Sequence, residues 1–227
     1  MIIGKGMIAK AFNSYKNNKD ILVFASGVSN SKELNKLEFE REKNLLLKSL
    51  EEYSEYTFIY FSTCSMYDES MINSYYVKHK LEMEGLISST HKFFYIFRLP
   101  HVVGKATSPT IINYLYQKIK FNESFDLWIN SSRNLIDVED VFTIVKYIIN
   151  KRIYLNETIN IASSNSVKIM ELIETLEKLL DKSANFKTLA KGSSYDIDIS
   201  KIELICEKLG IVFNEEYSKK IISKYYS

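Results

Sequence analysis

The chain has 227 residues, of which 46% are hydrophobic and 26% charged, a composition that excludes a disordered protein and is typical of a globular one. Its 30 basic and 28 acidic residues nearly cancel, so charge predicts neither nucleic acid nor a membrane surface as a partner. No apolar run is long enough to span a bilayer, and the first residues lack the features of a signal peptide. The two cysteines, Cys64 and Cys206, form no metal or redox motif. We therefore expect a cytoplasmic protein without a metal site.

Short apolar runs alternate with helical patterns along the chain, which predicts an α/β fold with a mainly parallel sheet. The expected strands are residues 2–4, 21–25, 57–61, 93–98 and 158–161. The expected helices are residues 8–15, 39–53, 76–87, 141–149 and 169–180, where apolar residues recur at helical spacing. Near the C-terminal end, Ser200 and Glu203 are spaced as a capping box, and Gly210 is the expected end of that helix. Cys206 lies on the apolar side of the same helix, so we expect it in the core.

The first strand runs directly into a glycine-rich turn, GKGMIA, that opens a helical pattern. In such a turn Gly4 would make the tight bend, and Gly6 would let backbone N–H groups approach a pyrophosphate. Ala9 would allow the helix to pack closely on the strand. A strand-to-helix turn needs glycines for its own geometry, so the motif alone is a weak indication of a dinucleotide site.

A second pattern joins the stretch FSTCSMY to the tyrosine and lysine of SYYVKHKLEME. Tyr76 and Lys80 are four residues apart, so in a helix they share one face. A nearby ammonium favours the ionised phenol, which makes the pair a candidate acid/base device. The chain has 16 tyrosines, so this spacing also arises by chance, and Tyr75 is an alternative for the buried position.

The order of these motifs resembles the extended short-chain dehydrogenase/reductase family, in its nucleotide-sugar epimerase, dehydratase and reductase branch. After the two patterns above come FRLPHVVGK, RNLIDVEDV and TINIASSNSVKIMELI, so the resemblance covers nearly the whole chain. It implies a single domain with a Rossmann-like parallel sheet flanked by helices. The expected Rossmann-like core is residues 1–103 and 134–162, with a small substrate-binding region at 104–133 and 163–227.

The resemblance also assigns catalytic roles to individual residues. Tyr76 matches the tyrosine that gives or takes a proton at the sugar oxygen. Lys80 matches the lysine that holds the nicotinamide ribose and favours tyrosinate. Thr63 matches the Ser/Thr that binds the reacting oxygen, with Ser62 and Ser65 as the alternatives, and Ser65 is also placed among the substrate contacts.

The cofactor and the substrate follow from the same resemblance. It implies NAD or NADP, held by Gly4, Lys5, Gly6, Met7, Ile8, Ala25, Ser26, Gly27, Lys80 and Pro100. It implies a nucleotide-sugar substrate whose diphosphate is contacted by His101 and Arg133, where His101 stands at a position that is often Asn. It further implies a homodimer formed through the helices at 39–53 and 76–87.

The chain departs from this family pattern in its first half. Two βα units are missing, so the strand ILVFASG reads as the fourth strand of the family rather than the second. The first strand should then lie at the edge of the sheet. The acidic residue that would hold an adenosine ribose is absent together with its strand. The loop between Tyr67 and Tyr76, which normally helps to close the active site, is also short.

Two classes of function remain open on these grounds. The first is an NAD(P)-dependent reductase or epimerase of a nucleotide-linked sugar, in the biosynthesis of polysaccharide precursors. The second is a non-catalytic protein that binds a nucleotide-sugar or acts as a scaffold and has lost dinucleotide binding. An enzyme of this fold that works without external NAD(P) is a third possibility, because fold does not fix function.

Overall fold

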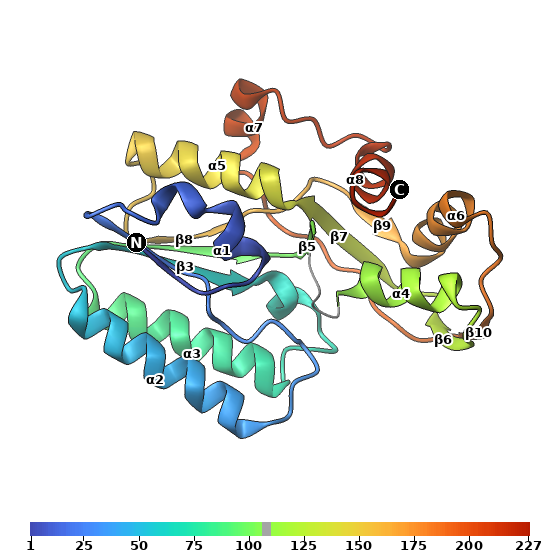
Figure 1. Ribbon diagram of the computed structural model, residues 1–227, viewed down its shortest axis with the longest axis horizontal. Coiled ribbons are helices and arrows are strands. Elements are labelled where there is room, and N and C mark those ends of the chain that lie inside the picture. Colours follow the sequence, from blue (N-terminus) through green and yellow to red (C-terminus); the bar gives the residue numbers. More distant parts are fainter. Residues whose placement is uncertain (106–109) are drawn as a thin grey trace.

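The computed structural model describes residues 1–105 and 110–227, and Figure 1 shows the arrangement of its helices and strands. The elements around the main sheet are β1 (Ile2–Ile3), α1 (Met7–Ala11), η1 (Asn13–Tyr15), β2 (Ile21–Phe24), α2 (Lys36–Glu52), β3 (Thr57–Thr63), η2 (Cys64–Tyr67), α3 (Tyr75–Thr90), β4 (Phe94–Leu99), α5 (Val138–Lys151), β8 (Glu157–Asn160) and α7 (Glu203–Leu209). The remaining elements are β5 (His101–Val103), α4 (Ile111–Lys120), β6 (Phe125–Trp128), β7 (Ser132–Asp137), β9 (Ser166–Lys168), α6 (Ile169–Leu180), β10 (Phe186–Leu189) and α8 (Tyr217–Tyr226).

The main sheet has five parallel strands in the order β1-β2-β3-β4-β8. This confirms the predicted α/β fold with a Rossmann-like parallel sheet. The two-residue β1 lies at one edge, as expected from the missing βα units, and pairs only with β2 among the described strands. No described strand lies beyond β1 on the side where further strands of a complete Rossmann sheet would continue.

Helices cover both faces of this sheet, and the alternation of side chains along β3 explains why. Phe58 and Tyr60 point to one face, where they pack with Leu46 of α2 and Met83 of α3. Ile59 and Phe61 point to the other face, which is covered by α1, α5 and α7. Figure 1 shows α2 and α3 together below the sheet and α5 above it. A strand buried on both faces reads as a continuous apolar run, as FIYF does.

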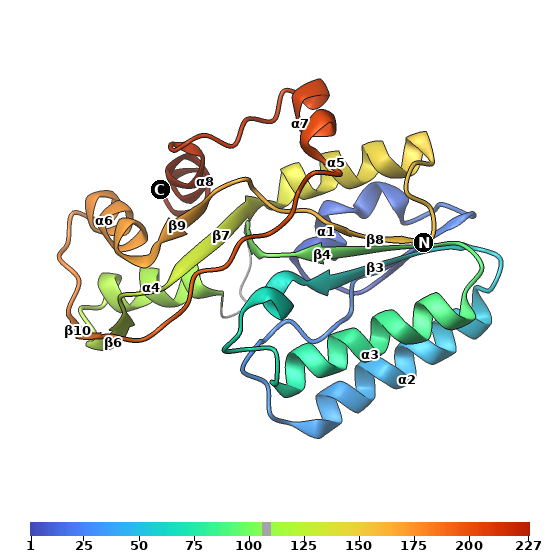
Figure 2. The ribbon, with the colours of Figure 1, turned by 180° about the vertical axis from the view of Figure 1, so that it is seen from behind.

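A smaller part of the molecule extends from the carboxyl end of the sheet. It contains the strand order β5-β7-β9, the pair β10-β6, and the helices α4, α6 and α8. These helices surround a second apolar cluster that includes Ile119, Leu172 and Ile222, all fully or almost fully buried. Figure 2 shows the segment after β10 running back across β7 toward α7. Residues 104–133 were expected to belong to this region, and 106–109 of them lie outside the described residues.

The expected elements are present, but the expected helix at 8–15 is divided into α1 and the 3-10 helix η1, and one predicted cap is wrong. The strands β5, β6, β7, β9 and β10 and the helices α4 and α8 were not predicted. The five expected strands are all present, and Gly210 ends α7 with a left-handed φ of 69°. The predicted capping box is wrong: α7 begins after Ile202, and no side chain caps it. Ser200 instead donates its backbone N–H to the Asp198 carboxylate at 2.9 Å. In a capping box this N–H would have bonded to the side chain of Glu203. Among residues 1–105 and 110–227, no helix has both the length and the apolar character needed to cross a membrane.

Candidate active site

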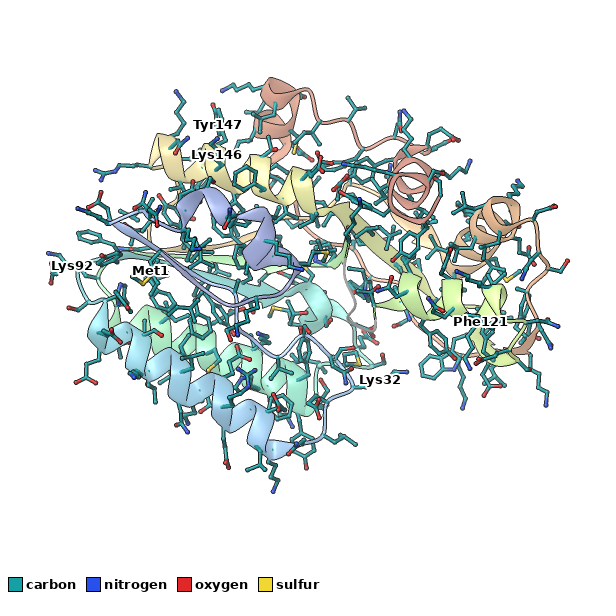
Figure 3. The ribbon with its side chains drawn as sticks, viewed as in Figure 1. Met1, Lys32, Lys92, Phe121, Lys146 and Tyr147 are labelled. Carbon is teal, nitrogen blue, oxygen red and sulfur yellow. The ribbon has the colours of Figure 1, made fainter. Side chains whose placement is uncertain are left out.

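The carboxyl ends of the parallel strands bring the expected site residues to one edge of the sheet. The turns that start there are residues 4–6 after β1, 25–27 after β2, η2 after β3 and Pro100 after β4. Ligands of open parallel sheets bind outside this edge. Figure 3 shows Met1 and Lys92 at the amino ends of their strands and Lys32 beyond the opposite, carboxyl end.

The two glycines of the first turn have different surroundings. Gly4 has a φ of +135°, and a Cβ there would lie 2.2 Å from the carbonyl oxygen of Ala25, so the fold itself requires glycine. Gly6 has ordinary extended backbone, with φ −74° and ψ −172°, and a Cβ there would meet no atom within 4 Å. Lys5 and Gly6 are exposed. The loop therefore leaves open backbone at Gly6, where an anion can approach.

Met7 and Ile8, which follow Gly6, pack against other parts of the protein and are half-buried. Ile8 packs against the core cluster on the α5 side of the sheet. Met7 opens α1, and its sulfur would lie 2.6 Å from a Cβ on Gly104. Pro100 is half-buried between β4 and β5. Met7 and Gly104 thus join the glycine loop to the strand that leads into the smaller region.

Tyr76 is the buried member of the tyrosine pair, since 8% of it is exposed against 63% of Tyr75. Thr63, the last residue of β3, acts on the Tyr76 hydroxyl in the direction that lowers its pKa. Thr63 in turn donates to the Ser65 hydroxyl at 3.0 Å. Burial raises the pKa of Tyr76 to about 12, Thr63 opposes that rise, and the negative charge of Glu42 adds to it. Tyr76 is therefore protonated at neutral pH in this state.

Lys80 lies one turn after Tyr76 on α3 and is buried, but its ammonium is directed elsewhere. It donates to Glu42 Oε1 at 2.9 Å and to the Tyr60 hydroxyl at 3.1 Å. Glu42, on α2, is fully buried and also accepts from the Tyr60 hydroxyl at 2.7 Å. In this state the ammonium is compensated by a carboxylate, so it does not act as the expected free cation beside Tyr76.

Glu42 is the main site residue that sequence reasoning missed. The sequence does contain a signal for it, because Glu42 lies at helical spacing from Leu46 and Leu50 and so on the buried face of α2. A carboxylate at a core position of a helix requires a buried partner. The partner could not be read locally, because Lys80 is 38 residues further along the chain.

The turn after β2 packs directly on this buried pair. A Cβ at Gly27 would lie 2.4 Å from Lys80 Nζ and 2.8 Å from Glu42 Oε1, so a side chain there would displace the end of one of these two side chains. The carbonyl of Ser26 accepts from both terminal nitrogens of Arg41 at 3.3 Å. Gly27 was predicted to contact the cofactor, and in the structure it also packs on the Lys80–Glu42 pair.

Ser62 and Cys64, the residues on either side of Thr63, have other surroundings. Ser62 donates to Glu84 Oε1 at 2.5 Å, and Glu84 is paired with Arg98 at 2.6 Å, so Ser62 belongs to a network that ties α3 to β4. Cys64 is fully buried, and burial raises the pKa of its thiol far above the usual range. Its thiol is therefore unreactive in this state.

The expected substrate residues form a polar cluster with two partners that the sequence did not reveal. His101 opens β5, and burial together with the positive charge of Arg133 lowers its pKa to about 4, so the ring is neutral. Arg133 donates to the Ser132 carbonyl at 2.7 Å. Asp68, after η2, accepts from the Ser193 hydroxyl at 2.7 Å, across 125 residues of chain. Asp68 raises the pKa of His101, opposing the other two effects.

Comparison with known proteins identifies the family. The model of the NAD dependent epimerase/dehydratase family matches residues 22–162, which is more than half of the chain. The protein belongs to this family. The matched range contains Thr63, Tyr76 and Lys80 and leaves the glycine loop outside it. No curated protein sequence matches the chain.

Solved structures with the fold of this family member include several proteins at low sequence identity. RMD from Pseudomonas aeruginosa, complexed with NADPH, is 16% identical with a TM-score of 0.73, over 98% of this chain and 97% of that one. MoeE5, in complex with UDP-glucose and NAD, is 14% identical with a TM-score of 0.72, over 98% and 95%. The UDP-N-acetylglucosamine 4-epimerase from Bacillus cereus is 20% identical with a TM-score of 0.70, over 98% and 81%. At these identities the likeness shows the fold.

Proposed function

We propose that this protein is an NAD(P)-dependent reductase or epimerase of a nucleotide-linked sugar, acting in the cytoplasm in the biosynthesis of polysaccharide precursors. The observation that carries the proposal is the buried Tyr76 side chain, which lies with Thr63 at the carboxyl edge of the sheet. Membership of the NAD dependent epimerase/dehydratase family supports the same reading. The fold neighbours bound to NADPH, or to UDP-glucose and NAD, support the cofactor and the substrate class.

The residues at the carboxyl edge of the sheet are suited to binding one part of a dinucleotide. The open backbone at Gly6, reached past the tight turn at Gly4, suits a pyrophosphate, and Lys5 is exposed beside it. Ala25, Ser26, Met7, Ile8 and Pro100 border the same edge. The adenosine half has less support, because β1 is the edge strand of the described sheet. A bound nicotinamide would supply the two-electron chemistry that the side chains lack.

The protonation of Tyr76 indicates which direction of the reaction this state serves. With its pKa raised to about 12, the phenol holds its proton and can donate it to an oxygen that gains charge. Thr63 would orient that oxygen through its hydroxyl. This is the role required in a reductase. An epimerase needs the same residue to accept a proton first, which this state does not favour.

The substrate diphosphate is proposed to lie between the Rossmann-like core, residues 1–103 and 134–162, and the small region, residues 104–133 and 163–227. His101 of β5 and Arg133 of the paired strand β7 would contribute to this site, with Ser65 nearer the sugar. A neutral imidazole can donate one hydrogen bond, and a guanidinium can bind two phosphate oxygens at once. Asp68 limits the net positive charge of this cluster.

The experiment that tests the enzyme reading compares two adjacent tyrosines. Tyr76→Phe should lower turnover of UDP-sugars with NADH or NADPH by at least about 1,000-fold, because it removes the proton donor. Tyr75→Phe, which changes an exposed side chain on the same helix, is the matched control and should retain turnover. Unchanged turnover in Tyr76→Phe would remove this residue from the mechanism.

A second candidate, a non-catalytic nucleotide-sugar-binding protein, is favoured by the commitment of Lys80 to Glu42 and by the edge position of β1. Titration with NADH and NADPH, followed by nicotinamide fluorescence, separates the two candidates. Micromolar binding of either dinucleotide supports the enzyme. Binding of a UDP-sugar with no binding of either dinucleotide supports the second candidate.

We also propose a homodimer formed through α2 and α3. Both helices carry an exposed leucine on their outer side, Leu47 at 40% and Leu81 at 37% exposure. Sedimentation velocity at micromolar concentration should give twice the monomer mass. Leu81→Lys should then lower that mass, and a monomer in the unmodified protein would contradict the proposal.

A further inference from the structure

A fully enclosed cluster of charged and polar groups lies between α2, α3 and β3, beneath the turn at Gly27. Its centre is the Glu42 carboxylate, with no exposed surface. Oε1 accepts from the Tyr60 hydroxyl at 2.7 Å and from Lys80 Nζ at 2.9 Å. Oε2 accepts from the Val28 backbone N–H at 2.6 Å and lies 3.1 Å from His79 Nε2. Both oxygens are therefore occupied by groups from two elements, β3 and α3, and from the turn after β2.

The electrostatics of this cluster keep Glu42 ionised. Burial alone would raise its pKa, but Lys80, His79, Tyr60 and the Val28 N–H together hold the pKa far below the usual range of a carboxyl group. Taking an ammonium and a carboxylate out of water is expensive, and apolar residues would fill such a site as well or better for stability. The neighbouring positions on the same stripe, Leu46 and Leu50, show the apolar solution. A buried pair at this one position therefore points to a role other than packing.

The position of the cluster connects it to Tyr76. Lys80 lies one helical turn after Tyr76, at the spacing that lets an ammonium reach the same face. In the part of the chain that the structure describes, its hydrogen bonds go to Glu42 and Tyr60 instead. The Gly27 turn lies against the cluster and limits the space around the ammonium.

We propose that Glu42 is a positioning residue of the Tyr76 site, which holds the Lys80 ammonium in a buried ion pair and so determines whether the Tyr76 hydroxyl keeps its proton. This inference rests on the proposed function for its catalytic meaning. While Lys80 is bound to Glu42, Tyr76 is an acid. Movement of Lys80 from Glu42 toward Tyr76 would leave an ammonium beside the phenol and make it a base.

The groups that act on Tyr76 come from each element packed around it. Thr63, at the end of β3, lowers the pKa of Tyr76. Glu42 on α2 and the Cys64 thiol of η2 act in the other direction. Tyr60 of β3 bridges Glu42 to Lys80 and is itself held in the protonated form by burial and by the charge of Glu42. Glu42 is the ionised carboxylate among these groups, so its removal should lower the pKa of Tyr76.

The test measures ionisation of Tyr76 directly, without cofactor, substrate or turnover. The full chain is labelled with [13Cζ]tyrosine, and the Tyr76 signal is assigned by its loss in Tyr76→Phe. We expect no ionisation of Tyr76 below pH 11 in the unmodified protein. Glu42→Gln should lower the midpoint by about one pH unit or more, because the carboxylate is lost and the Lys80 charge is no longer compensated.

Two further variants make the result specific. Asp140 lies on α5, on the other side of the sheet from α2 and α3, and its half-buried carboxylate accepts from the Tyr217 hydroxyl at 2.6 Å. Asp140→Asn removes this carboxylate and should leave the ionisation midpoint of Tyr76 unchanged. If Glu42→Gln does not fold, Glu42→Asp keeps the charge but withdraws it from Lys80, and should lower the midpoint by a smaller amount. A Tyr76 midpoint that is unchanged in the folded Glu42 variant, or equally lowered in Asp140→Asn, overturns the proposal. Because turnover is not measured, failure here and failure of the proposed enzyme activity are separate outcomes.

Discussion

Gly4 and Gly6 lie in the same turn but serve different purposes, and substitution separates them. Gly4→Ala places a side chain at a φ of +135° and against the Ala25 carbonyl. We expect it to lower the free energy of unfolding by about 2 kcal/mol or more. Gly6→Ala meets no atom within 4 Å and should change that free energy by less than about 0.5 kcal/mol. Urea denaturation measures both.

Dinucleotide affinity supplies the second half of this test. Because only Gly6 opens onto free surface, Gly6→Ala should weaken NADH or NADPH binding by about 10-fold despite its normal stability. Retained affinity in the stable Gly6→Ala protein would show that the open backbone does not serve the cofactor.

His101 predicts a pH dependence of stability whose sign can be worked out. Burial and Arg133 lower its pKa to about 4 in the folded protein, whereas an unfolded histidine titrates near 6.5. The neutral ring therefore contributes stability above pH 6.5, and this contribution is lost as the pH falls from 6.5 to 4. We expect His101→Gln, whose amide stays neutral, to lose less stability between pH 7.5 and 4.5 than the unmodified protein. Urea midpoints at these two pH values give the comparison, and equal losses would contradict the inferred environment of the ring.

At the scale of elements, two ion pairs join helices to their surroundings with different consequences. Glu84 of α3 is buried and binds Arg98 of β4 at 2.6 Å. Lys43 of α2 binds Glu82 of α3 at the same distance, with both side chains more than 40% exposed. Arg98→Met leaves a buried carboxylate without its cation and should lower the free energy of unfolding by about 3 kcal/mol. Lys43→Met should change it by less than about 1 kcal/mol.

A double variant checks the cause of that loss. Arg98→Met combined with Glu84→Gln removes both charges, so thermal denaturation should show part of the stability restored. If the double variant were less stable than Arg98→Met by the full cost of a second deletion, the two side chains would be acting independently.

The strands and helices of the main sheet were predictable because their signals are local, whereas α4, α8 and the short strands of the smaller region were not predicted. FIYF reads as a strand buried on both faces, and the spacing of Tyr76 and Lys80 placed them on one helical face. The capping box failed because the Asp198 carboxylate, two residues before Ser200, binds the same backbone group first. A pattern of two residues does not include such a competitor.

The site was predictable only as far as the motif reaches. Tyr76 and Thr63 are 13 positions apart across one βα unit, and the sequence pattern joins them. Glu42 and Ser193 reach the site from distant segments, through Lys80 and Asp68 respectively, and no spacing rule connects them. The sequence therefore pointed to the proposed acid, Tyr76, and did not reveal the groups that we propose to control its protonation.

At the scale of the whole molecule, the buried phenol of Tyr76 and the half-buried phenol of Tyr195 predict loss of stability in alkali. Burial raises the pKa of Tyr76 and of Tyr195 to about 12, while unfolded tyrosine titrates near 10. Their contribution is complete below pH 10 and is lost as the pH rises from 10 to 12. The free energy of unfolding should fall over this window by at most about 1.4 kcal/mol per pH unit for each phenol. Urea titrations at pH 9, 10 and 11 measure the slope, and a flat profile above pH 10 would contradict the burial of these two side chains.

The position of the smaller region within the chain also has a consequence for the order of folding. The neighbouring strands β4 (Phe94–Leu99) and β8 (Glu157–Asn160) are separated in sequence by β5, α4, β6, β7 and α5. Pairing them closes a long loop, whose entropy is lost before the new contacts form. During synthesis, the first four strands of the sheet leave the ribosome well before the fifth exists. The apolar edge of β4 therefore stays uncovered for that interval, which makes this edge the place where a nascent chain would be captured by a chaperone or by another copy.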